Sequence, residues 1–165
     1  MNQTKTQAET WRRRLRADLA TPAEVKTWAD GVIASIENPE VWLIDVSMAA
    51  SKPELNEALL RAPGEADARE VFCGIIASLT DLLACRPDLD SEIARALFQM
   101  YMDGDVPANE KLGEMASFWD DIDLARDGTY GDVDEQRERM RAFLERWSRP
   151  GYATEQSGRG DGRQG

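Results

Sequence analysis

The chain has 165 residues, a length typical of one domain, and 42% of them are hydrophobic, which is enough to form a core. Its 31 acidic and 20 basic residues give a net charge of −11. Histidine is absent, which excludes histidine-ligated metal sites, Ser-His-Asp and Cys-His catalysis, and every general-base role of imidazole.

Helical periodicity begins near the N-terminus. Apolar residues recur every four positions from Trp11 to Leu19, which predicts an amphipathic helix within residues 1–20. This segment is basic, and we expect it to pair with acidic residues elsewhere in the protein rather than with nucleic acid. A second helix is expected to begin at Pro22, because Thr21 opens a capping-box motif in front of it.

Two shorter helices are expected next. The apolar segment 41–44 favours a helix over a strand, since Pro39 and Glu40 precede it. A second capping-box motif at Ser51 predicts a helix that ends before the break at residues 62–64, whose sequence is Ala-Pro-Gly.

Residues 65–85 are predicted to form the central helix of the core. Apolar residues cover more than one of its faces, as expected for a helix surrounded by others. It contains Cys73 and Cys85, which a continuous helix would hold roughly 18 Å apart, too far for a disulfide. The two thiols are therefore expected to be reduced. The N-terminus has no apolar signal segment, and the sequence has no run of about 20 apolar residues. We therefore predict a cytoplasmic protein that does not enter a membrane.

Three further helices are predicted in the C-terminal half. The first runs from residue 89 to Asp103, where Gly104 can adopt the left-handed conformation of a helix end. The second follows Val106 and Pro107 and ends at residues 127–128, and the third holds the apolar residues between 133 and 147. Residues 150–165 lack apolar periodicity and are expected to form a disordered tail.

Neither the alternation typical of strands nor an internal repeat interrupts this helical pattern. The predicted fold class is therefore all-α, a single-domain bundle of about six or seven helices. We expect a basic amphipathic helix at residues 1–20, an acidic helical domain at 21–149 and the tail at 150–165.

Charge is distributed unevenly along the chain. Residues 1–20 carry a charge of +3 and residues 149–165 carry +1, so the segment between them carries −15. Within residues 103–134, ten acidic residues against two basic ones give −8. This acidic stretch is the most informative feature for function.

Four aspartates occupy the last two turns of the helix that ends near residue 127: Asp120, Asp121, Asp123 and Asp127. The negative end of the helix dipole destabilises a carboxylate there by about 0.3–1 kcal/mol. A basic partner surface would turn this cost into binding energy. We therefore expect these aspartates to bind a protein partner, with Trp119 and Tyr130 as aromatic anchors.

The acidic residues also allow metal-binding interpretations. Residues 123–134 resemble a calcium-binding EF-hand loop, but Ala125 replaces one acidic ligand and Asp134 replaces the bidentate glutamate. All-α nucleotide pyrophosphohydrolases hold Mg²⁺ through pairs of acids three residues apart, and such pairs here are Glu54 with Glu57, Asp67 with Glu70, and Asp120 with Asp123. These spacings arise freely among 31 acids, and no basic phosphate-binding loop accompanies them. We assign no catalytic residue, metal ligand or cofactor.

A short motif in the acidic region resembles a known family. The run Phe118-Trp119-Asp120-Asp121-Ile122-Asp123 is followed by Ala125, Asp127-Gly128, Tyr130-Gly131 and a helix that ends in Phe143-Leu144. This arrangement, over about residues 95–147, resembles the C-terminal part of small acidic helical immunity proteins. Those bacterial proteins neutralise polymorphic or contact-dependent toxins by binding the toxin domain. The resemblance implies a basic toxin domain as the partner.

From the sequence we expect a non-enzymatic, acidic, cytoplasmic binding protein. We expect it to act as an immunity or inhibitor protein that occludes the surface of a toxin or another basic partner. One alternative is a Mg²⁺-dependent enzyme similar to the pyrophosphohydrolases, and another is an acidic adapter or regulatory protein. Nucleic acid and membranes are not expected partners, and the oligomeric state stays open.

Overall fold

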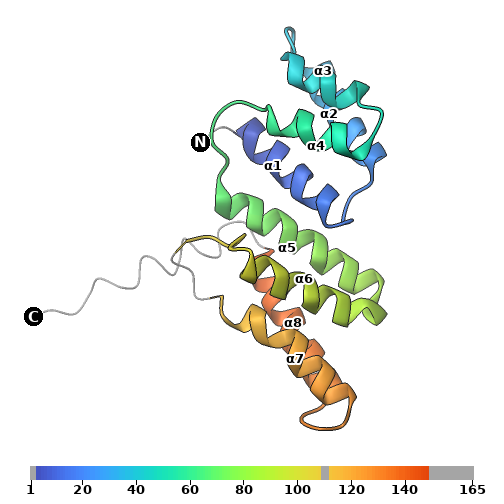
Figure 1. Cartoon of the computed structure of the whole chain (residues 1–165), viewed down its shortest axis with the longest axis vertical. Helices are drawn as coiled ribbons and strands as arrows, with labels where there is room; N and C mark the ends of the chain where they lie inside the picture. The colour runs from blue at the N-terminus through green and yellow to red at the C-terminus, as the bar shows by residue number, and fades with distance from the viewer. Residues whose placement is uncertain (1–2, 109–111, 149–165) are drawn as a thin grey trace, which may run out of the picture. The chain divides into compact units, whose positions relative to one another are not determined.

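The computed structural model describes residues 3–108 and 112–148, which form α-helices, one short 3-10 turn and no strand (Figure 1). Within these ranges the eight α-helices and the turn η1 are α1 (Gln3–Arg16), α2 (Pro22–Ser35), α3 (Val41–Met48), α4 (Lys52–Leu60), α5 (Ala68–Cys85), η1 (Pro87–Leu89), α6 (Asp90–Met102), α7 (Glu114–Arg126) and α8 (Val133–Trp147). The all-α fold class is confirmed. The described ranges hold eight α-helices where about six or seven were expected, and the segments after Glu40 and after Ser51 form separate helices, as their sequences predict.

The chain divides into two compact units, residues 1–71 (unit 1) and residues 72–165 (unit 2). The boundary falls inside α5. Within unit 1, α1 packs against α4, so the basic N-terminal helix is part of a larger helical unit. The tail expected at 150–165 lies outside the described residues. None of the helices in the described ranges has the length and apolar content that a membrane span requires.

Unit 1 places four helices around one apolar core. α2 packs against α3, α1 against α4, and α3 against α4. The buried apolar residues of this core are Ala8, Leu15, Val25, Ala29, Trp42, Leu43, Val46, Ala49, Leu55, Ala58, Leu59 and Ala62. Trp42 of this core ends a row of three tryptophans, with ring centroids 6.1 Å apart for Trp11 and Trp28 and 6.4 Å apart for Trp28 and Trp42. Side chains of this size contribute much of the apolar surface that is buried.

The helix starts in unit 1 follow the predicted capping motifs. The hydroxyl of Thr21 accepts a hydrogen bond from the backbone N–H of Glu24 at 3.3 Å, and the carboxylate of Glu24 accepts one from the backbone N–H of Thr21 at 2.7 Å. The backbone and hydroxyl of Thr21 thereby hold the pKa of Glu24 below its ordinary value. The motif at Ser51 is half formed: the Ser51 hydroxyl accepts from the N–H of Glu54, but the Glu54 carboxylate accepts from Ala50.

The central helix α5 begins at Ala68, three residues later than expected. Asp67 acts as its N-cap, because its carboxylate accepts hydrogen bonds from the N–H groups of Arg69 and Glu70 at 2.9 and 3.0 Å. Thr6 on α1 fixes this cap, since its hydroxyl accepts a hydrogen bond from the N–H of Asp67 at 2.8 Å. The two cysteines both lie in α5 and form no disulfide, as expected.

Two arginines of α1 form ion pairs within their own helix. Arg12 and Arg13 form ion pairs with Glu9, at N–O distances of 2.6 and 2.9 Å. Burial raises the pKa of Glu9, but the hydrogen bonds from these two arginines outweigh it and hold the pKa below its ordinary value. Arg14 lies over the Trp11 ring, with its guanidinium carbon 5.2 Å from the centroid. Glu9, a neighbour on α1, is thus one acidic partner of this cluster, whereas we expected partners in the acidic body of the chain.

Unit 2 consists of most of α5 together with α6, α7 and α8, and α7 packs against both α6 and α8. The largest fully buried side chains in this unit include Phe72, Ile76, Leu79, Leu83, Ile93, Leu97, Phe118 and Phe143. Two edge-to-face aromatic pairs order the core, Phe118 with Phe143 at 5.5 Å and Phe72 with Trp147 at 5.6 Å between ring centroids. This packing fixes which side of α7 faces solvent.

Candidate functional site

The exposed side of α7 carries three of the four aspartates expected to bind a partner. Phe118 and Ile122 are fully buried against the core, so the opposite side of α7 faces solvent. The exposed residues on this side are Asp120, Asp123, Leu124 and Asp127, at the spacing of one helix face. Together with Tyr130, we refer to these residues as the acidic face.

The chain after α7 turns back, which keeps Tyr130 beside the helix. Gly128 adopts a φ of +71°, the left-handed conformation expected at this helix end. The carbonyl of Leu124 accepts hydrogen bonds from the N–H groups of Thr129 and Tyr130 at 3.0 and 3.3 Å. The Tyr130 side chain is 72% exposed. The backbone of an exposed tyrosine is therefore held beside the last turn of α7.

The carboxylates of the acidic face have few internal partners. Among the described residues, Asp120 and Asp127 form no ion pair and accept no side-chain hydrogen bond. Asp123 accepts one long hydrogen bond, from the hydroxyl of Ser91 at 3.5 Å. Asp123 and Asp127 also lie at the C-terminal end of α7, where the helix dipole is unfavourable to a carboxylate, whereas Asp120 lies near the middle of the helix.

Two of the six residues predicted to bind a partner have a different environment. Asp121 is half-buried and forms an ion pair with Arg139 of α8 at 3.1 Å. Trp119 is half-buried between α7 and α6: its ring lies 5.3 Å from that of Phe98, and the guanidinium of Arg95 lies 5.3 Å from its centroid. Both side chains thus contribute to the packing of α7 in unit 2, and the structure does not group them with the acidic face.

A buried carboxylate beside the acidic face was not singled out from the sequence. Asp90, the first residue of α6, has no exposed surface. Its carboxylate accepts hydrogen bonds from Arg126 at 2.7 Å, from two nitrogens of Arg137 at 2.9 and 2.7 Å, and from the N–H of Ser91 at 2.8 Å. Asp90 therefore connects α6 to the end of α7 through Arg126 and to α8 through Arg137.

This network keeps Asp90 ionised despite its burial. Burial raises the pKa of the Asp90 carboxyl, but the hydrogen bonds from Arg137 and Arg126 outweigh it, and the pKa is held below its ordinary value. Arg126 also donates to the hydroxyl of Ser91 at 2.5 Å, and Ser91 in turn donates to Asp123. The network thus supports one edge of the acidic face and positions the last turn of α7.

The residues considered for metal binding are distributed over separate places. Asp67 caps α5, as described above, and Asp132 of the EF-hand-like segment caps α8 by accepting from the N–H groups of Asp134 and Glu135 at 2.9 and 3.1 Å. Within the ranges that the structure describes, no group of three or more Asp, Glu or Cys side chains lies close enough together to hold a metal ion. The carboxylate pairs are therefore not combined into one site among these residues.

Comparisons with protein-family models, with curated proteins and with solved structures found no match to this chain. The case for a function therefore rests on the chemistry of the chain's own residues.

Proposed function

We propose that this protein binds another protein through the acidic face of α7, and that it acts as an immunity or inhibitor protein by covering a basic surface of its partner. The observation that carries the proposal is the exposed state of Asp120, Asp123 and Asp127 over two turns of one helix, beside the exposed ring of Tyr130. Other acids of this unit, Asp90 and Asp121, are paired with arginines.

Electrostatics favours a basic partner for this face. Asp123 and Asp127 lie at the negative end of the helix dipole, where each carboxylate costs about 0.3–1 kcal/mol in the free protein, and they repel each other across one turn. Lysine or arginine side chains of a partner would relieve this repulsion and accelerate association, up to about 10⁸ M⁻¹s⁻¹ at low salt. Leu124 and Tyr130 supply apolar surface that a bound partner would exclude from water.

The proposal is tested by capture of a partner and then by inhibition. The tagged full-length chain is incubated with lysate of its source cells and washed at low and then high salt, and the retained proteins are identified by mass spectrometry. We expect one stoichiometric basic protein whose retention falls as salt rises. Co-expression should then relieve any toxicity of that partner, because an immunity protein blocks its activity.

The double variant Asp120→Asn and Asp123→Asn should weaken capture of the partner at least tenfold, mainly through slower association. A matched control, Asp81→Asn with Glu92→Gln, removes the same charge from exposed positions on α5 and α6. Equal weakening by both double variants would show that net charge alone attracts the partner and would overturn the assignment of the acidic face. A captured partner whose activity is unaffected would instead favour the adapter alternative.

A further inference from the structure

Helix α3 in unit 1 is apolar on both its buried and its exposed side. Trp42, Leu43 and Val46 are buried in the core. On the other side, Val41 is 72% exposed, Ile44 42% and Met48 76%. Large apolar side chains at positions i, i+3 and i+7 form a continuous stripe along one helix face, which is the pattern of a helix that is covered on both sides.

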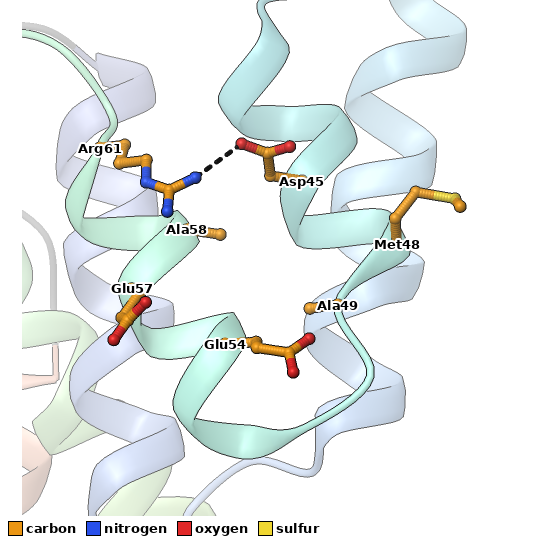
Figure 2. Close-up of a pocket in the computed structure, with 7 residues that line it drawn as sticks. All are labelled: Asp45, Met48, Ala49, Glu54, Glu57, Ala58 and Arg61. Atoms are coloured by element: carbon orange, nitrogen blue, oxygen red, sulfur yellow. Dashed lines mark hydrogen bonds and ion pairs between the residues drawn. The ribbon is translucent and has the colours of Figure 1, made fainter.

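A groove between α3 and α4 continues from this stripe (Figure 2). Its volume is about 260 Å³, and Figure 2 shows Ala49 and Ala58 pointing into the space between the two helices, while the Met48 side chain extends from α3 on the side away from α4. Both alanines are buried, and their small side chains allow another backbone to approach closely. Methionine is flexible and polarisable, which suits it to contact a partner of varied shape. The groove therefore has a floor of small residues beside the exposed apolar stripe of α3, a combination that suits an amphipathic helix.

The walls of the groove are acidic. Asp45 forms an ion pair with Arg61 across the groove at 2.9 Å, as the dashed line in Figure 2 marks. Glu54 and Glu57 extend from α4 beside it, and both are exposed. Three carboxylates against one guanidinium leave a negative charge along the groove, so a cationic partner fits it better than an anionic one.

We propose that the groove between α3 and α4 binds an amphipathic helix of another protein, with apolar residues against Ala49, Ala58 and the flanking Met48 and lysine or arginine residues against Glu54 and Glu57. A second copy of this chain fits less well, because a symmetric pairing would place the acidic walls of the two copies against each other. The site lies wholly in unit 1 and does not depend on the acidic face of α7.

The test uses a synthetic helical peptide of leucine, alanine and lysine, with leucines along one face, as the probe. Binding to the full chain is measured by fluorescence anisotropy, and a peptide with glutamate in place of every lysine serves as the charge control. We expect the lysine peptide to bind in a salt-dependent manner and the glutamate peptide to bind at least tenfold more weakly.

Met48→Ser removes apolar surface without a change of charge and should weaken binding of the lysine peptide about tenfold. Met102→Ser is the matched control, because Met102 on α6 is a similarly exposed methionine, 62% accessible, outside the groove. Met48 makes little contact with the core, so the variant is expected to keep its circular dichroism spectrum and melting temperature. Equal loss in both methionine variants would overturn the proposal, and so would the absence of binding by the lysine peptide.

Two further outcomes separate this site from its competitors. If Asp120→Asn with Asp123→Asn weakens binding of the lysine peptide and Met48→Ser does not, the peptide binds the acidic face of α7 and the groove proposal fails. If sedimentation reveals a dimer that Met48→Ser dissociates, a second copy occupies the groove and the proposed occupant is wrong. Loss of peptide binding in Met48→Ser alone supports the groove whatever the outcome of the capture experiment on α7.

Discussion

Removal of the charge of Asp90 is expected to destabilise unit 2 strongly. The carboxylate is fully buried and accepts hydrogen bonds from Arg126 and Arg137. Asp90→Asn leaves both guanidiniums opposite a neutral amide, and loss of one partner of a buried ion pair costs about 3–5 kcal/mol. Because 47% of the Arg126 side chain and 26% of the Arg137 side chain remain accessible to water, we expect the lower end, about 3 kcal/mol.

Urea unfolding followed by circular dichroism measures this loss as a lower midpoint of the transition of unit 2. The matched control is Asp88→Asn, two residues earlier in the chain, where the carboxylate pairs with Arg86 at 2.7 Å but is exposed to solvent. An exposed pair of this kind contributes little, so the control should unfold like the wild type. Our reasoning about Asp90 is refuted if the two variants have the same midpoint.

The same carboxylate predicts a dependence of stability on pH. Burial raises the pKa of Asp90, yet the hydrogen bonds from Arg137 and Arg126 hold it below the ordinary 3.8 in the folded protein. The unfolded chain therefore takes up the proton first as pH falls, and the stabilisation is complete above about pH 3.8 and is lost as pH falls through the folded pKa. The difference in unfolding free energy between wild type and Asp90→Asn should shrink below about pH 3.8. A difference that stays constant with pH would contradict this assignment.

Two further variants test the local structure by thermal unfolding. Thr21→Ala removes the side-chain cap of α2 and should lower the free energy of unfolding by about 1 kcal/mol; an unchanged melting temperature would show that the cap contributes nothing. Gly128→Ala forces a side chain into a φ of +71° and should cost about 1 kcal/mol, whereas Gly113→Ala, at a φ of −57° with open space around it, should be neutral or slightly stabilising. Equal effects of the two alanines would refute the backbone argument.

Helix boundaries were largely predictable because their signals are local. Thr21 caps α2 through a residue three positions away, and Gly104 and Gly128 end α6 and α7 through their own backbone conformation. The start of α5 was predicted too early, since Asp67 caps the helix in place of the residues just after Gly64. Here the apolar pattern alone was not enough to locate the first turn.

The tertiary partners of the acidic residues were not predictable from spacing. Asp90 contacts Arg126 and Arg137, which lie 36 and 47 residues further along the chain. One signal was present, since Arg126 is one of only two basic residues in the stretch 103–134. In a sequence with 31 acids, however, that signal does not indicate which carboxylate the arginine meets.

The exposed stripe of α3 was missed for a related reason. Apolar residues at helical spacing predict a core face, and Val41 and Ile44 fit such a face as well as Trp42 and Leu43 do. In a helix that is apolar on all sides, the sequence does not indicate which side packs inward. The structure resolves this because α2 and α4 both pack against α3 and bury only one of its sides.

The positions of the tryptophans make each unit observable by its own fluorescence. Trp11, Trp28 and Trp42 belong to unit 1, while Trp119 and Trp147 belong to unit 2. Indole emission shifts to longer wavelength when the ring becomes hydrated, so phenylalanine at positions 119 and 147 would leave a signal from unit 1 alone. Phenylalanine in place of Trp11, Trp28 and Trp42 would leave the signal of unit 2 alone. Comparison of the two unfolding curves would then measure whether a helix shared by both units makes them melt as one cooperative body.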